Sequence, residues 1–311
     1  MRLSKGYFYI LGATIFWGVS ATIAKSLFER HFDALILVQM RITISCILLL
    51  GFFLVFRPRL LVVTPRDLLK FSLLGILGIA GSNFAYYYTI QETNVATAIL
   101  LQYMAPVLVL MYAALSATEK LTLTKVLAAL ASLLGCTLAL FGKNIANLTA
   151  RSSSAFLGGA GLPSITWAGL AMGVLSAFCW AFTNISLRRI LREYTVWTAL
   201  AYTFIFASLF WLVINPPWAI LAAGYSAHDW WIFFLIAVAS ILIPHSLYYT
   251  GVRYLTPTRA IITASFEPVV AIISAFLFLG ETLNHVQILG SGIVIGAIVL
   301  LQMNNQNRQE E

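Results

Sequence analysis

Long runs of apolar residues, separated by short polar breaks, dominate the sequence. Ten of these runs approach the roughly 20 residues that an α-helix needs to cross a bilayer. They predict an all-α membrane protein with ten transmembrane helices, five in each half of the chain. The runs cover residues 6–26, 34–55, 69–90, 94–115, 122–142, 165–187, 196–214, 230–251, 258–279 and 285–302.

Matching residues recur in the two halves at a nearly constant spacing. The pairs are 162 or 163 residues apart: Trp17 with Trp180, Pro106 with Pro268, and Tyr86-Tyr87 with Tyr248-Tyr249. Such self-similarity indicates an internal duplication. Because each copy has an odd number of crossings, the copies would insert upside down relative to each other, as in many secondary transporters.

The longest break between apolar runs predicts the boundary between the two copies. It spans residues 143–164 and is rich in serine and glycine, which is typical of a linker. We therefore expect a first five-helix repeat in residues 1–142 and a second in 165–311. A cleaved signal peptide is the alternative for the first run, but that run carries Trp17 and belongs to the repeat.

The composition supports a membrane protein, and the placement of charge predicts its orientation. The chain is 60% hydrophobic and 10% charged, whereas soluble domains contain about 25% charged residues. A net charge of +8 could suggest nucleic acid, but with the N-terminus inside, fourteen basic residues fall on the cytoplasmic side and four outside. This asymmetry follows the positive-inside rule. We expect a multi-pass protein of the inner (cytoplasmic) membrane with both termini in the cytoplasm.

Several function classes lack their signature residues. Cys46, Cys136 and Cys179 are scattered, without metal-ligand or disulfide spacing. The four histidines are dispersed, and no phosphate-binding loop of the G-x-x-x-x-G-K type is present. We therefore expect no metal, no cofactor, no catalytic site and no nucleic-acid partner.

Two prolines mark helix breaks near the middle of the membrane. Pro106 and Pro268 lie inside apolar runs, where a proline removes a backbone hydrogen bond. A symmetric pair of breaks is a pointer to the substrate site of a repeat transporter. A static kink that only shapes the bundle is the alternative. The polar neighbours of the prolines, Gln102, Tyr103 and Ser265, become candidate substrate-binding residues.

Glu267 is the acidic residue predicted deepest in the membrane, directly before Pro268. An intramembrane carboxylate is costly unless it is paired, hydrated or protonated. We hypothesise that it binds the amino group of a cationic or zwitterionic substrate, or exchanges a proton with it. Arg41 in the second run is the obvious charge partner, and a structural bridge between Glu267 and Arg41 is the alternative.

Aromatic residues near the centres of their runs predict the wall of a cavity. Indole and phenol rings suit flat apolar or cationic solutes through stacking and cation-π contacts. For any single ring, core packing remains the alternative. The candidate binding residues of this group are Trp17, Tyr86, Trp180 and Tyr248, with Asn83 and His245 one turn before the tyrosines.

Two kinds of residue are assigned to structure rather than transport. Glu119 and Glu281 end matching runs and predict hairpin turns, with Glu119 capping the next helix or pairing with Lys120 or Lys125. Glycines at helical spacing, such as Gly290, Gly292 and Gly296, predict close helix contacts in lipid.

The paired motifs resemble the EamA family of the drug/metabolite transporter superfamily. The resemblance rests on Trp17-Gly18, Arg41, Ala105-Pro106, Glu267-Pro268, and the Glu-x-Leu turns at Glu119 and Glu281. It implies an inner-membrane protein with two inverted five-helix repeats, a central cavity, and export of amino acids or other small metabolites, with proton antiport in some members. Trp180 is followed by Ala181 rather than glycine, and no acidic residue matches Glu267 in the first copy.

From these features we predict a secondary transporter that exports amino acids or related small organic metabolites by alternating access. Its partners would be the small-molecule substrate, the lipid bilayer and protons. Export over import rests on the family resemblance alone. An uptake permease for a small metabolite, a non-transporting membrane scaffold and a membrane-embedded enzyme are the alternatives.

Overall fold

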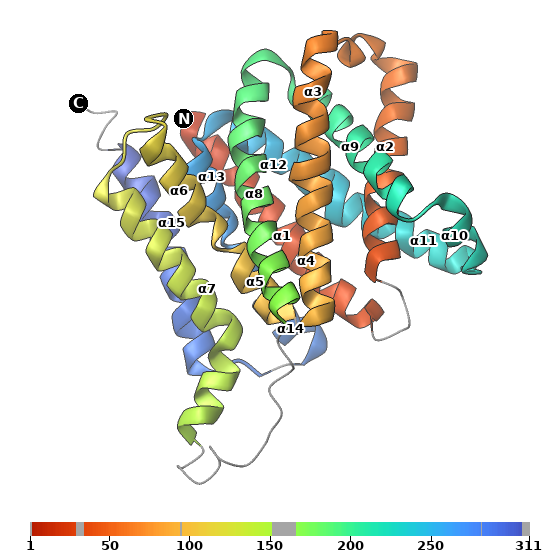
Figure 1. Cartoon of the computed structure of the whole chain (residues 1–311). Helices are drawn as coiled ribbons and strands as arrows, with labels where there is room; N and C mark the ends of the chain where they lie inside the picture. Colours follow the sequence, from red (N-terminus) through yellow and green to blue (C-terminus); the bar gives the residue numbers. More distant parts are fainter. Residues whose placement is uncertain (1, 29–33, 94, 151–165, 281, 307–311) are drawn as a thin grey trace.

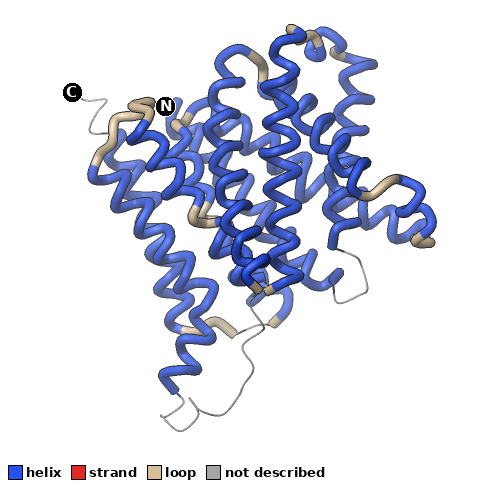
Figure 2. The backbone as a smooth tube through the Cα atoms, in the orientation of Figure 1, coloured by secondary structure: helices blue, strands red, loops and turns tan. Residues whose placement is uncertain are grey.

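The computed structural model describes residues 2–28, 34–93, 95–150, 166–280 and 282–306. Within these ranges the chain is mostly helical and contains no β-strand (Figure 2). Nine helical stretches of the described chain are long and apolar enough to cross a bilayer, and α1 (Arg2–Phe28) is a further helix of 27 residues. The protein is therefore a multi-pass membrane protein.

The helices of the N-terminal half follow the predicted apolar runs. Their bounds, after α1, are α2 (Ala34–Phe56), η1 (Pro58–Leu61), α3 (Pro65–Leu73), η2 (Leu74–Ala80), α4 (Gly81–Glu92), α5 (Val95–Gln102), α6 (Ala105–Leu115) and α7 (Leu123–Ala150). α7 continues to Ala150, eight residues into the segment expected to be a linker.

The helices of the C-terminal half begin with α8. Their bounds are α8 (Trp167–Glu193), α9 (Val196–Ile214), α10 (Pro217–Ala222), α11 (Ala227–Ile236), η4 (Ala237–Leu242), α12 (Ile243–Tyr254), α13 (Pro257–Ala264), α14 (Glu267–Leu279) and α15 (His285–Gln306). η2 and η4 are π-helical segments inside longer helical stretches. They occupy corresponding positions in the two halves.

The first helix of each half packs against the other half. α1 lies against α12, α13 and α14, whereas α8 lies mainly against η2, α4, α5 and α6 (Figure 1). The largest core cluster accordingly joins residues from both halves, such as Ile10, Phe71, Leu187 and Tyr248. The largest core cluster thus extends across both halves.

α7 and α15 pack extensively against each other and stand at one edge of the bundle (Figure 1). A Cβ atom on Gly290 would lie 2.5 Å from the backbone nitrogen of Ala139, so only glycine permits this approach, as expected for helices in lipid. Gly292 and Gly296 face open space instead. The predicted glycine contact is therefore present at one of these three positions.

The outer surface of the bundle is apolar, and its first and last described helices have one end on the same side. Large hydrophobic side chains such as Phe8, Leu115 and Phe278 are exposed, as expected for a surface that faces lipid. The beginning of α1 and the end of α15 lie at the same end of the bundle (Figure 1).

Candidate functional site

Two helices are interrupted at corresponding places, each just before a proline. α5 ends at Gln102 and α6 begins at Ala105, while α13 ends at Ala264 and α14 begins at Glu267. The breaks precede Pro106 and Pro268 because a proline has no N–H to bond the carbonyl four residues earlier and its ring clashes with that carbonyl. Each break therefore frees backbone groups within the bundle.

Tyr103 connects the two breaks. Its hydroxyl lies 3.0 Å from Oε2 of Glu267 and 3.4 Å from the backbone oxygen of Ala264. Ala264 carries the carbonyl that Pro268 cannot bond, so the phenol of one break donates to the acceptors of the other. This contact places the Glu267 carboxylate at the junction of the two halves.

The π-helical segments lead directly into the polar side chains of the site. Asn83 follows η2, and its Nδ2 donates to the oxygen of Ile79 at 2.8 Å. His245 follows η4, and its Nδ1 lies 3.0 Å from the oxygen of Ile241. π-helical turns widen a helix locally and are frequent at functional sites. Here they occur in the two stretches that carry the matched residues Asn83 and His245.

The matched tryptophans meet in the centre of the bundle. The rings of Trp17 and Trp180 are edge to face at 6.0 Å, and Tyr248 packs 5.2 Å from Trp17 and 5.5 Å from Trp180. Tyr248 is fully buried and its hydroxyl donates to Oδ1 of Asn184. Trp17 and Trp180 therefore line the cavity, and both rings also pack against Tyr248.

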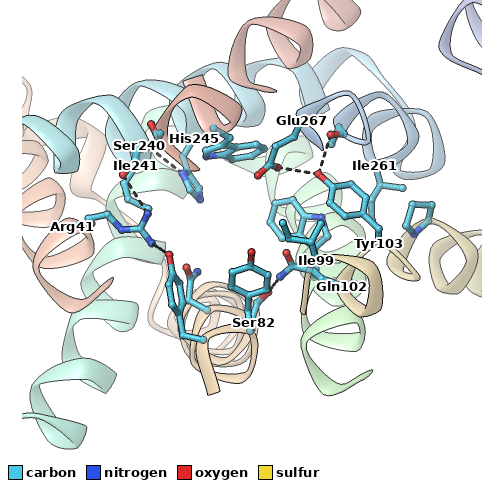
Figure 3. Close-up of a pocket in the computed structure, with 18 residues that line it drawn as sticks. Arg41, Ser82, Ile99, Gln102, Tyr103, Ser240, Ile241, His245, Ile261 and Glu267 are labelled. Carbon is cyan, nitrogen blue, oxygen red and sulfur yellow. Dashed lines mark hydrogen bonds between the residues drawn. The ribbon is translucent and has the colours of Figure 1, made fainter. Parts of the chain in front are cut away.

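Arg41 is buried in the wall opposite Glu267. Its Nη2 donates to the hydroxyl of Tyr87 at 3.0 Å, and its Nη1 to the hydroxyl of Ser240 at 3.4 Å. The expected alternative of a structural Glu267–Arg41 bridge is not formed: the ion pairs among the described residues do not include it. The two charges instead face each other across the cavity (Figure 3).

These groups enclose a cavity of about 150 Å³ between the two halves (Figure 3). Ten of the predicted site residues line it: Trp17, Arg41, Asn83, Tyr86, Gln102, Tyr103, Pro106, Trp180, His245 and Glu267. Sequence reasoning missed Ser20, Ser82, Tyr87, Ile99, Ser240, Ile241, Ile261 and Ala264. Of these, Ser20, Ser82 and Ser240 could have been predicted, because a serine inside an apolar run is a polar group that often faces a cavity.

Three predicted site residues do not line the cavity. Tyr248 lies behind the tryptophans. Ser265 is fully buried, and its hydroxyl is directed to the oxygen of Ile261 at 3.5 Å. Pro268 is at the start of α14, one position past the lining residue Glu267. A helix turns each successive side chain by about 100°, so neighbours of a lining residue in the sequence often point elsewhere.

Glu119 caps a helix of the other half rather than the next helix. Its Oε2 is 2.6 Å from Nζ of Lys125, and its Oε1 accepts from the backbone N–H of Thr258 at 3.2 Å in the first turn of α13. The pairing with Lys125 was predicted, whereas the cap on α13 was not. Glu281 lies outside the described residues. Helix α13 leads directly to the break that carries Glu267.

Sequence comparison identifies relatives over nearly the whole chain. The sequence model of the EamA-like transporter family matches residues 4–141 and 167–303. The chain is 23% identical to the uncharacterized inner membrane transporter YicL of Salmonella typhimurium, over 98% of this chain and 97% of that protein. It is 26% identical to the threonine/homoserine exporter RhtA of Escherichia coli, over 89% and 84%. A solved crystal structure superposes with a TM-score of 0.72 at 15% identity, over 95% and 97% of the two chains, and it supports the fold alone.

Proposed function

Because the chain belongs to the EamA-like transporter family, we propose that it exports amino acids or related small organic metabolites by alternating access. The family assignment makes it a membrane transporter and not an enzyme. The observation that carries the proposal is the cavity between two helix breaks, with a carboxylate at their junction. Transport by a secondary mechanism needs such a site, open to each side of the membrane in turn.

The architecture proposed for this mechanism is a pair of inverted five-helix repeats, in residues 1–142 and 165–311, with α1 as the tenth span. The spacing of the helix breaks supports it, since Ala105 and Glu267 begin matching helices 162 residues apart. α1 and α8 also run in opposite directions through the bundle (Figure 1). Two family matches of similar length, on either side of the proposed linker, agree with a duplication.

Glu267 is the proposed group for the amino end of the substrate. Its carboxylate borders the cavity and is hydrogen-bonded to Tyr103. A carboxylate inside the membrane is stable when it is neutralised, and either a substrate ammonium group or a proton achieves this. Competition between the two would couple export to proton entry. The aromatic walls around Trp17 and Trp180 add favourable contacts for cations.

The size of the cavity and the relatives support small solutes. Pockets for drug-sized ligands measure roughly 300–1,000 Å³, so a cavity of about 150 Å³ fits a small metabolite better. RhtA, at 26% identity, is a threonine/homoserine exporter, and these amino acids are the first substrates to test. We place the protein in the inner membrane with both ends of the chain in the cytoplasm, in agreement with the charge asymmetry.

Purified protein in liposomes tests the proposal. Threonine, homoserine and a wider panel of amino acids are loaded inside, and release is followed with and without an imposed pH gradient. We expect release of at least one amino acid, accelerated by the gradient, and a loss of that acceleration in Glu267→Gln. Glu193→Gln, at an exposed carboxylate paired with Lys70 outside the cavity, is the matched control and should behave as wild type.

Three outcomes would contradict parts of the transport mechanism. Unchanged gradient-driven release in Glu267→Gln would remove this carboxylate from the coupling mechanism. Accumulation rather than release under the physiological gradient would make the protein an uptake permease. Absence of transport for every amino acid tested would refute the substrate class. The architecture has its own test, because reporter tags that place the two chain ends on opposite sides of the membrane would refute the inverted repeat.

A further inference from the structure

Arg41 is a buried cation that no acidic residue of the described chain neutralises. It is 8% exposed. Its hydrogen bonds go to two neutral hydroxyl groups, those of Tyr87 and Ser240, and its Nε has no partner. Its guanidinium carbon also lies 5.7 Å from the centroid of the Tyr87 ring. These contacts orient the charge but do not compensate it.

Lys125, another buried basic residue, shows how the same protein treats a structural cation. Lys125 is 6% exposed, and its Nζ lies 2.6 Å from a carboxylate oxygen of Glu119. A buried charge is costly unless a counter-charge is close, and within a membrane bundle such residues mark pathways for ions or substrates. Arg41 has the burial of Lys125 without its counter-ion, and it opens onto the cavity.

We propose that Arg41 is the binding site for a carboxylate group of the transported solute. The guanidinium has a planar set of donors that matches a carboxylate, and Tyr87 and Ser240 hold it at the cavity wall. Because Glu267 lies on the opposite wall (Figure 3), a solute that satisfies both charges carries an ammonium group and a carboxylate together. This inference rests on the proposed transport function and narrows its substrate class to amino carboxylates, as opposed to amines or polyamines.

A purely structural role for Arg41 makes the opposite predictions. If the guanidinium served only to join α2 to Tyr87 and Ser240, its loss would destabilise the fold and leave substrate preference unchanged. If it serves as an anion site, removing an uncompensated charge leaves the stability of the empty protein equal or higher, because binding groups are often retained at a cost to stability. A variant without the guanidinium would then lose binding of ligands that carry a carboxylate, and ligands without one would be unaffected.

The test compares L-threonine with L-threoninamide, which lacks the negative charge but keeps the amino group and side chain. Binding to purified protein is measured for wild type, Arg41→Gln and the control Arg189→Gln, which removes one exposed positive charge outside the cavity. We expect wild type to bind threonine at least about tenfold more tightly than the amide, a difference typical of one charged hydrogen-bonded contact. Arg41→Gln should lose this preference, and Arg189→Gln should keep it.

A second measurement tests the anion site at Arg41 independently of whether threonine is the substrate. Melting temperatures are recorded without ligand and with acetate, lactate or glycolate. Carboxylates that stabilise wild type but not Arg41→Gln would support the anion site even if threonine is not transported. A wild type that none of these anions and no amino acid stabilises would overturn it. Retained preference for threonine over the amide in Arg41→Gln would overturn it too, while leaving amino-acid export intact.

Arg41→Lys covers the case in which Arg41→Gln does not fold. It keeps the positive charge but replaces the planar fork by a single ammonium group. We expect a weaker preference for threonine over threoninamide than in wild type, with no loss of melting temperature. A folded Arg41→Lys protein with an unchanged preference for threonine over threoninamide and a lowered melting temperature would show that Arg41 has a purely structural role.

Discussion

The ion pair between Glu119 and Lys125 should make a large contribution to stability. Both side chains are nearly buried, at 7% and 8% exposure, and their charged atoms are 2.6 Å apart. Removing one partner of a buried pair leaves the other charge uncompensated, which costs about 3–5 kcal/mol. Glu119→Gln keeps an oxygen that can accept from the N–H of Thr258, so we expect a value near the lower limit, about 3 kcal/mol.

A double-mutant cycle measures the pair directly. Glu119→Gln, Lys125→Met and the double variant are unfolded in mixed detergent micelles, with helix content followed by circular dichroism. We expect the double variant to lose clearly less stability than the sum of the single variants, with a coupling of about 1–3 kcal/mol. Lys120→Met is the matched control, because Lys120 is exposed and contributes only its backbone oxygen to Lys125.

Additive single effects would refute this reasoning. They would show that Glu119 and Lys125 do not compensate each other in the folded protein, and that the cap on α13 is the main role of Glu119. If Lys120→Met lost as much stability as Lys125→Met, a positive charge anywhere in this turn would stabilise the protein, whether it is buried or not. Either result would mean that the buried lysine is not stabilised by the ion pair.

The remaining predictions concern packing, a turn and the site. Gly290→Ala should lower the free energy of unfolding by about 1–3 kcal/mol, because the new methyl group would lie 2.5 Å from the backbone of α7. Gly292→Ala, in open space, should change it little. Unfolding of both variants in detergent measures the difference. Ala117 has a φ of 50° in the turn after α6, where the matching turn has Gly280 with a φ of 66°. Ala117→Gly should therefore raise the melting temperature, through a gain of about 1 kcal/mol, and an unchanged or lower value would show that the backbone of Ala117 is not strained. Tyr103→Phe removes the hydrogen bond to Glu267 and should slow amino-acid release about tenfold, while the melting curve remains cooperative; equal rates would exclude a role for this bond.

The sequence was sufficient for most of the helices and for the general position of the cavity. Apolar runs predict the membrane spans because the hydrocarbon interior demands about 20 apolar residues for each crossing. The matched prolines located both helix breaks, since the loss of a backbone hydrogen bond is a local property of proline. Polar residues such as Gln102 and Glu267 pointed to the cavity because such groups inside an apolar run are costly unless they face a partner or a polar space.

The details of pairing could not be predicted, because they depend on how the helices rotate and pack. A bridge between Arg41 and Glu267 was the structural alternative that their opposite charges suggested, yet the two residues lie on opposite walls of the cavity. The cap of Glu119 on Thr258 joins residues 139 positions apart, and no local pattern indicates it. The π-helical segments before Asn83 and His245 likewise have no recognisable sequence signature.

The exchange of first helices between the halves has a consequence for biogenesis. When the ribosome has completed α7, α1 still lacks the surfaces of α12, α13 and α14 against which it packs. Until the last third of the chain has been inserted, α1 lies in the bilayer without these packing partners. A gene split within the segment between α7 and α8 should therefore give two fragments that are each degraded when made alone and that persist when produced together.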